Sequence, residues 1–219
     1  MNMKFDWEKY NTDKNIKGHG YNRCYDDLLG NIRYDCKKIL EIGTRIGSIS
    51  LWKDYFPNAK IYGIDLISPS YSVGDGRFIF EQINQGNEEQ LNEFINKHGG
   101  NFDVIIDDGP HSTREQMVSF NLLFKNIKSG GVYVVEDLHC TEYTGNTKEK
   151  CDQMRGGLNY SFLDKSLEFE KQIFKENEYL YNLEDIKNTM GNVVITKAER
   201  VRWKEIQQHP SEIVFIFKK

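Results

Sequence analysis

The chain has 219 residues, of which 38% are hydrophobic and 28% charged, with only 4 prolines. A domain of this size buries roughly 70–75% of the surface that its unfolded chain exposes, so the composition excludes a largely disordered chain or one that depends on disulfides. The 29 basic and 33 acidic residues give a net charge of -4, without the basic excess of a nucleic-acid binder. We therefore expect a small-molecule enzyme or binding domain.

Location and domain count follow from the same inspection. No apolar run reaches the ~18 residues of a membrane helix, and the charged N-terminus has no apolar core like that of a secretory signal. The cysteines show neither CxxC pairing nor zinc-ligand spacing: Cys24, Cys36, Cys140 and Cys151. We expect reduced thiols, a cytoplasmic protein without membrane contact, and a single domain over residues 1–219.

Short apolar runs closed by Gly or Asp predict seven strands, at residues 38–43, 60–65, 77–83, 102–108, 131–137, 192–197 and 212–219. The first, second, fourth and fifth are nearly continuous in apolar character, which is typical of parallel strands covered on both faces. The last two are separated only by a loop, which favours an antiparallel hairpin at one edge of the sheet.

Helices are predicted between these strands at residues 48–56, 88–98 and 113–128. Pro57 ends the first, and Ser129-Gly130-Gly131 ends the third. Residues 152–188 are charged and also predicted to be helical. Alternation of strands and helices with short connections predicts a doubly wound α/β fold around a mostly parallel sheet.

Ligands of such sheets bind beyond the carboxyl ends of the strands, so the residues that follow each apolar run are the site candidates. The first turn has an ExGxxxG pattern, whose glycines permit a tight turn and close approach to a ligand. Asp65 ends the second strand, where a carboxylate can accept hydrogen bonds from ribose hydroxyls. The GxGxxG spacing of a dinucleotide site is absent, and Glu41 would repel a phosphate. S-adenosylmethionine, which has a ribose but no phosphate, is the predicted cofactor; the candidate residues of the turn are Glu41, Gly43, Thr44 and Gly47.

Carboxylates also follow the fourth and fifth strands. Asp108, Glu136 and Asp137 would repel one another unless a proton or a cation lies between them. Oxygen ligands in this number suit magnesium, calcium or manganese better than zinc, although helix caps or ion pairs explain the same spacing. His111, three residues after Asp108, is a candidate general base, because an imidazole exchanges protons near neutral pH.

These motifs occur together in a known group of enzymes. TDKN…HGY (residues 12–21), ILEIGTRIGSISLWKDYFPNAKIYGID, DVIIDDGPH and GGVYVVEDL resemble the macrocin and mycinamicin sugar O-methyltransferases. That group belongs to the class I S-adenosylmethionine-dependent methyltransferases and depends on magnesium. The resemblance implies that Asp108, Glu136 and Asp137 hold the metal and that His111 is the base.

The resemblance also implies roles for other positions. Asn84 and Gln85 would lie near the adenine, in a segment where Asn84 and Asn87 replace two aspartates of the group. Asp107 would lie near the methionine end of the cofactor. Residues 1–35 would form a helical segment folded over the site, and the candidates for substrate contact are His19, Tyr21 and His139.

The resulting hypothesis is methyl transfer to a hydroxyl of a sugar, glycosylated or polysaccharide acceptor. The metal would bind neighbouring oxygens of the acceptor and acidify one of them, while His111 removes the proton. His139 is the next candidate base. Nitrogen as the methylated atom stays open, as does a homo-oligomer formed through exposed edge strands. Four further residues are assigned either to the acceptor pocket or to the core: Tyr143, Met154, Tyr160 and Phe162.

Two other classes of function remain in view. The same fold and DDGxH segment resemble the cephalosporin hydroxylase group, in which Asp108, His111 and His139 would form a two-histidine, one-carboxylate iron site. A methyltransferase fold without activity could instead serve as a binding subunit. A nicotinamide-dependent oxidoreductase is disfavoured, because the phosphate-binding turn is missing.

Overall fold

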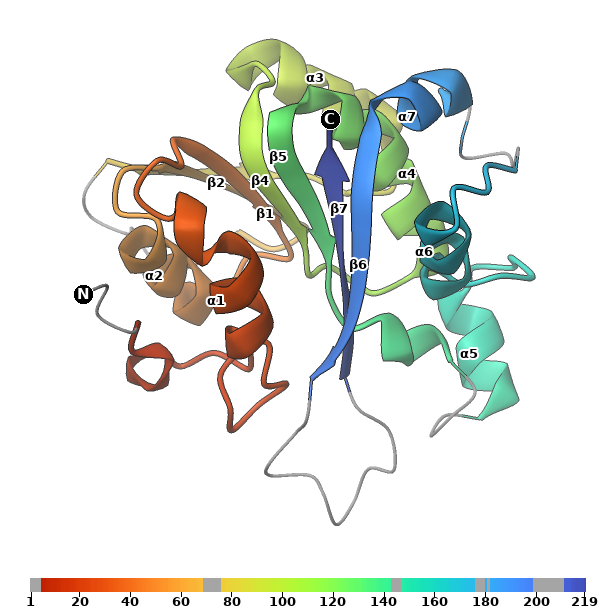
Figure 1. The fold of residues 1–219 in the computed structure, drawn as a ribbon, viewed down its shortest axis with the longest axis horizontal. Helices are drawn as coiled ribbons and strands as arrows, with labels where there is room; N and C mark the ends of the chain where they lie inside the picture. Colours follow the sequence, from red (N-terminus) through yellow and green to blue (C-terminus); the bar gives the residue numbers. More distant parts are fainter. Residues whose placement is uncertain (1–4, 69–75, 143–146, 176–179, 181, 199–210) are drawn as a thin grey trace.

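A computed structural model describes residues 5–68, 76–142, 147–175, 180, 182–198 and 211–219 (Figure 1). Its strands form one seven-stranded sheet in the order β3-β2-β1-β4-β5-β7-β6. Strands β1 to β5 are parallel, whereas β7 runs antiparallel to both β5 and β6. The predicted doubly wound sheet with an antiparallel edge hairpin is confirmed. The strands are β1 (Lys38–Ile42), β2 (Lys60–Asp65), β3 (Phe78–Gln82), β4 (Phe102–Asp107), β5 (Ile127–Val135), β6 (Met190–Ala198) and β7 (Ser211–Lys218).

Helices cover both faces of the sheet and bury two apolar clusters against it (Figure 1). On one face lie α1 (Asn22–Leu29) and α2 (Ile46–Tyr55), whose Tyr25 and Trp52 are completely buried. On the other face lie α3 (Glu88–His98), α4 (Thr113–Leu123), α6 (Phe162–Glu170) and α7 (Leu183–Thr189). The short α5 (Lys148–Met154) precedes α6. Among the described residues, no helix is long and apolar enough to cross a membrane.

The predicted boundary between α4 and β5 is wrong. The helix ends at Leu123 and a short 3-10 turn follows (Phe124–Asn126), so that β5 begins at Ile127 rather than at Gly131. The first residues of β5 include an exposed Lys-Ser-Gly stretch (residues 128–130), which has no apolar pattern to reveal a strand. Hydrogen bonding to β4 extends the strand there, as the pairing of Phe102 with Ile127 shows. The predicted helical region 152–188 is likewise divided among α5, α6 and α7.

The N-terminal segment, defined here as residues 5–35, packs against α2 and reaches the carboxyl ends of the central strands. Trp7 and Tyr10 are buried in the same apolar cluster as Trp52. The Trp7 indole donates a hydrogen bond to Asp26, within the segment itself. The segment continues through α1 and a 3-10 turn (Gly30–Ile32) into β1. Aromatic packing therefore fixes this part of the chain beside the predicted site.

Candidate active site

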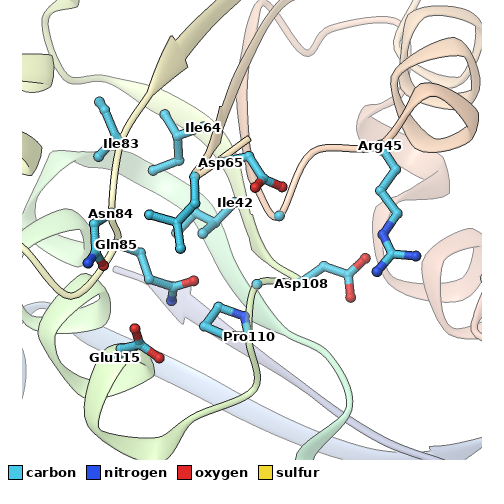
Figure 2. A pocket seen from close by; sticks show the side chains of 13 residues that line it. Ile42, Arg45, Ile64, Asp65, Ile83, Asn84, Gln85, Asp108, Pro110 and Glu115 are labelled. Carbon is cyan, nitrogen blue, oxygen red and sulfur yellow. The ribbon is translucent and has the colours of Figure 1, made fainter. Parts of the chain in front are cut away.

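A pocket opens at the carboxyl ends of β1, β2 and β4, next to the loop after β3 (Figure 2). Isoleucine side chains form apolar walls, and Asp65 and Gln85 add polar groups. Several predicted cofactor residues line this pocket, namely Gly43, Asp65, Asn84 and Gln85, together with Asp108 from the predicted metal set. The prediction had not included other lining residues, which are Ile42, Arg45, Ile64, Leu66, Ile83, Gly109, Pro110 and Glu115.

Gly43 is the position at which the turn after β1 requires glycine. Its φ angle of 81° lies in the left-handed region, and a Cβ atom there would lie 2.0 Å from the carbonyl oxygen of Asp108. Any side chain would therefore push the β1 turn away from the loop after β4. The pocket depends on this close approach of the two backbones.

Glu41 lies beneath the pocket rather than in its lining. Its carboxylate accepts hydrogen bonds of 2.7 Å from the Ser48 hydroxyl and from the Trp52 indole, both on α2. Burial raises the pKa of Glu41 to about 7. Thr44 is also turned inward, since its hydroxyl donates to the carbonyl oxygens of Glu41 and Ile64. These two residues hold the turn in shape.

Asp107 is buried and surrounded by neutral donors. Its oxygens accept hydrogen bonds from the Gln85 amide at 3.0 and 3.1 Å, from the Ser119 hydroxyl at 2.8 Å and from the Tyr133 hydroxyl at 3.2 Å. Burial raises the pKa of Asp107. The amide oxygen of Gln85 is buried without a hydrogen-bond partner among the described residues, although Gln85 lines the pocket. A ligand that donates a hydrogen bond, such as an amino group of adenine, would satisfy it.

Gly47 contacts the backbone of the N-terminal segment rather than the pocket. A Cβ atom on Gly47 would lie 1.8 Å from the carbonyl oxygen of Asn11. The glycine is buried in the first turn of α2 and does not line the pocket. Its lack of a side chain lets the backbone of the N-terminal segment lie directly on α2.

Three predicted residues converge beside the pocket in a group defined here as the cation cluster: Asp108, His111 and Asp137. Each offers a ligand atom, and these atoms lie within 4.8 Å of one another. His111 Nε2 is 3.5 Å from Asp137 Oδ2. Both His111 and Asp137 have left-handed backbones, with φ angles of 58° and 56°. Such backbones are uncommon for residues other than glycine, and strain of this kind is concentrated at functional sites.

Glu136, the third predicted metal ligand, faces a different pair of side chains. Lys14 Nζ donates hydrogen bonds to Glu136 Oε2 at 2.8 Å and to Asp108 Oδ2 at 2.6 Å. The Tyr25 hydroxyl donates to the other oxygen of Glu136. Lys14 is completely buried, and the attraction of the two carboxylates outweighs burial and raises its pKa well above the ordinary value. Burial also raises the pKa of Asp108, to about 6, and that of Glu136 well above its usual range.

Lys14 and Tyr25 were missed by the sequence prediction. Lys14 is the lysine of the TDK motif at residues 12–14, and the motif alone does not indicate a role for it. Nothing in the spacing of either residue shows that it meets a strand end 122 or 111 residues away. Only the docking of the N-terminal segment brings them there.

The residues predicted to contact the substrate, His19, Tyr21 and His139, lie around Asp137. Its Oδ1 atom accepts a 2.7 Å hydrogen bond from the Tyr21 hydroxyl and lies 3.2 Å from His19 Nδ1 and 3.9 Å from His139 Nδ1. Burial would raise the pKa of Asp137, but the three nearby imidazoles outweigh it and lower the pKa. The remaining acceptor candidates are divided: Phe162 is core, Tyr160 packs against the core, Met154 is half-buried, and Tyr143 lies outside the described residues.

The site fits a divalent cation through part of the predicted set. Asp108 and Asp137 present carboxylate oxygens of the kind that magnesium prefers. Glu136 would join them only by exchanging its hydrogen bonds with Lys14 or Tyr25. The pocket fits a nucleoside with its apolar walls, Asp65 and the buried acceptor of Gln85.

Sheet order, pocket position and strand-end carboxylates together define a Rossmann-like methyltransferase fold. The structure of MycE methyltransferase from the mycinamycin biosynthetic pathway, in complex with Mg, SAH and mycinamycin VI, superposes with a TM-score of 0.70. The match has 24% sequence identity and covers 99% of this chain and 55% of that chain. An O-methyltransferase from Bacillus cereus in complex with SAH superposes with a TM-score of 0.51 at 10% identity, over 90% of this chain and 81% of its own.

Curated relatives confirm the resemblance to the macrocin and mycinamicin sugar O-methyltransferases. The chain is 30% identical over 168 residues to the 8-demethyl-8-(2-methoxy-alpha-L-rhamnosyl)-tetracenomycin-C 3'-O-methyltransferase of Streptomyces olivaceus. It is 31% identical over 168 residues to the mycinamicin VI 2''-O-methyltransferase of Micromonospora griseorubida and to the demethylmacrocin O-methyltransferase of Streptomyces fradiae. Each alignment covers 71% of this chain but only 42–43% of the relative, so the chain spans less than half the length of these enzymes. No protein-family model matches the sequence.

Proposed function

We propose that the protein is an S-adenosylmethionine-dependent, divalent-cation-assisted O-methyltransferase whose acceptor is a sugar hydroxyl. One observation carries the proposal: Asp108 belongs both to the pocket lining and to the cation cluster. A methyl donor in the pocket and a hydroxyl at the cluster would therefore be neighbours. Methyl transfer from sulfonium to oxygen needs this juxtaposition, because its catalysis rests largely on alignment of donor and acceptor.

Each group in the site has a part in this reaction. Asp65 would accept hydrogen bonds from the ribose, and Gln85 would accept one from the adenine amino group. Asp108 and Asp137 would hold a magnesium ion, which when bound supplies Lewis-acid activation and orientation of the acceptor hydroxyl. His111 would take the hydroxyl proton while the oxygen attacks the methyl group and S-adenosylhomocysteine leaves. Its Nε2 atom lies on the side of Asp137, which would stabilise the resulting imidazolium.

The proposed acceptor class comes from the curated relatives. Their names describe methylation of a rhamnosyl group on tetracenomycin, of mycinamicin VI and of demethylmacrocin. A sugar group is named in the rhamnosyl-tetracenomycin enzyme and in the L-olivosyl-oleandolide 3-O-methyltransferase of Streptomyces antibioticus, and a glycosyl hydroxyl is therefore the acceptor proposed here. The iron site expected from Asp108, His111 and His139 is not favoured, because His139 is grouped with His19 and Asp137 rather than with Asp108 and His111. A non-catalytic subunit is not favoured either, since the named relatives are methyltransferases.

Calorimetric titration with S-adenosylhomocysteine, in magnesium and again in EDTA, tests the cofactor site. We expect binding in both conditions and a loss of about tenfold or more in Asp65→Ala, which removes a charged hydrogen-bond acceptor. Glu93→Ala, on the exposed side of α3, is the matched control and should bind normally. Absence of binding by the unaltered protein in both buffers would overturn the proposal.

A second assay tests the acceptor class. The protein is incubated with S-adenosylmethionine carrying a labelled methyl group, magnesium and a panel of rhamnosides and other deoxyhexosyl glycosides. Label in a methoxy group of the sugar supports the proposal. Label on an amine, or on a non-sugar hydroxyl alone, contradicts it.

A further inference from the structure

The two oxygens of Asp137 face opposite groups of side chains. Oδ2 faces His111 in the cation cluster. Oδ1 faces His19 Nδ1 at 3.2 Å and His139 Nδ1 at 3.9 Å. The ligand atoms of His19, Asp137 and His139 all lie within 4.8 Å of one another, separately from the grouping of Asp108 with His111.

We propose that His19, Asp137 and His139 form a second cation site, one that takes a transition-metal ion such as zinc, nickel or cobalt. The site does not require the proposed methyl transfer to be correct. It lies beside the proposed magnesium position and shares Asp137 with it, so that this carboxylate would bridge two cations.

The distances suit such an ion. Metal–nitrogen and metal–oxygen bonds of about 2.0–2.2 Å place neighbouring ligand atoms roughly 3.0–3.5 Å apart in tetrahedral or octahedral coordination. The 3.2 Å separation of His19 Nδ1 from Asp137 Oδ1 already meets this spacing, and the 3.9 Å separation to His139 needs a shift of about half an ångström.

The donor set determines the class of ion. Imidazole nitrogen suits zinc, copper, iron and nickel, whereas magnesium prefers a shell of oxygen atoms. Two imidazoles and one carboxylate leave coordination positions open for water or a ligand. Asp137 Oδ1 therefore completes a set of ligands suited to a transition metal. Its Oδ2 faces the cation cluster, which contains a second carboxylate, Asp108.

Surrounding groups hold two of the three ligands in orientation. The Tyr21 hydroxyl donates to the same Asp137 oxygen at 2.7 Å, and the ring of His19 stacks on that of Tyr21 with centroids 5.4 Å apart. On the far side of His19, Asp13 Oδ2 lies 3.8 Å from Nε2. At 3.8 Å this is a charge contact rather than a hydrogen bond, and a carboxylate that comes close enough to accept the N–H of a ligating imidazole fixes its tautomer and increases its basicity.

The backbone brings Asp137 and His139 to the same side. Asp137 has its left-handed backbone immediately before a 3-10 turn (Leu138–Thr141), which contains His139. The N-terminal segment supplies His19. Ligands from two distant parts of the chain thus meet at one carboxylate, so an ion bound there would tie the N-terminal segment to the end of β5.

Cobalt titration of the untagged protein, in magnesium-containing buffer, tests the proposal through the visible d–d absorption of nitrogen-ligated Co²⁺. We expect one cobalt per chain, with binding weakened at least about tenfold in His19→Ala and in His139→Ala. Cys140→Ser and His111→Ala are the matched controls. Cys140 lies 4.0 Å from His139 Nε2 and offers a competing thiolate, whereas His111 belongs to the cation cluster.

The outcomes separate cleanly. Retained binding in both controls and loss in both histidine variants supports the site. No cobalt binding by the unaltered protein, equal binding by all variants, or loss confined to His111→Ala or Cys140→Ser overturns it. Tyr21→Phe keeps the aromatic stack and removes only the hydroxyl, so it provides a second test if a histidine variant does not fold. S-Adenosylhomocysteine binding, measured on the same samples, shows independently whether the proposed cofactor site is present.

Discussion

The cofactor side and the cation side of the site differ in how their buried carboxylates are balanced. On the cofactor side, Glu41 and Asp107 accept hydrogen bonds from neutral donors. Those of Glu41 are Ser48 and Trp52, and those of Asp107 include Gln85 and Ser119. Asp108 and Glu136, on the cation side, share the ammonium group of Lys14, and Asp137 faces imidazoles. The strands and the residues directly after them thus supply every carboxylate, whereas the ammonium group comes from the N-terminal segment. The carboxylates of the cofactor side are therefore held by neutral hydrogen bonds, whereas those of the cation side are held by cationic or titratable groups.

The largest expected effect is on turnover, and it distinguishes the cation side from the cofactor side because only kcat should change. His111→Ala should lower kcat by about 10²–10⁴-fold, because it removes the proposed general base. The affinity for S-adenosylhomocysteine should stay within twofold, since His111 does not line the pocket. Steady-state kinetics and calorimetry on the same preparation measure both quantities. A variant with full kcat at saturating substrate would show that His111 is not the base.

Lys14→Met tests the charge balance of the cation side. Removing the ammonium group leaves Asp108 and Glu136 buried without their cation, and we expect a loss of about 3–5 kcal/mol in the free energy of unfolding. Urea denaturation at pH 8 in EDTA measures it. Lys9→Met is the control, because Lys9 pairs with Asp54 at the surface and should contribute no more than about 1 kcal/mol. Equal effects of the two substitutions would show that Lys14 does not balance the buried carboxylates of the cation side.

Glu41, on the cofactor side, makes the free energy of unfolding depend on pH. Its pKa is about 7 in the folded protein against 4.5 for an ordinary glutamate, so the folded state binds the proton more tightly. The resulting stability is fully present below pH 4.5 and is lost as the pH rises through 7. Each pKa unit corresponds to about 1.4 kcal/mol, which predicts a loss of a few kcal/mol between pH 5 and 8.

Glu41→Gln isolates that dependence, because a neutral amide does not titrate but keeps both hydrogen bonds. Its oxygen can accept from the Trp52 indole, and its NH₂ group can donate to the Ser48 hydroxyl, which then donates to the Arg45 carbonyl oxygen. The unfolding free energy of the variant should fall less steeply over pH 5–8 than that of the unaltered protein. Urea denaturation at four pH values gives the two slopes. Parallel curves would mean that Glu41 does not titrate in this range.

The sequence was sufficient for the carboxylates and insufficient for their partners. Strand ends such as Asp65, Asp108 and Asp137 follow nearly continuous apolar runs, and a parallel sheet brings such ends to one edge, so local pattern and topology located them. Lys14 and Tyr25 reach Glu136 only through aromatic packing of the N-terminal segment, which no local pattern encodes. Gly47 shows the same limit: its spacing suggested a cofactor turn, but its contact is the backbone of Asn11.

The smallest expected effect tests that docking directly. Gly47→Ala would place a Cβ atom 1.8 Å from the Asn11 carbonyl, and overpacking of this kind costs about 1–3 kcal/mol. Gly30→Ala is the control, since its Cβ atom would meet nothing within 4 Å and its φ angle of -57° is helical. Urea denaturation compares the two. If the N-terminal segment balances the cation side as argued, Gly47→Ala should also make amide hydrogens around Lys14 exchange faster, whereas Gly30→Ala should leave them unchanged. Equal exchange in both would mean that the contact between Asn11 and Gly47 does not hold Lys14 in place.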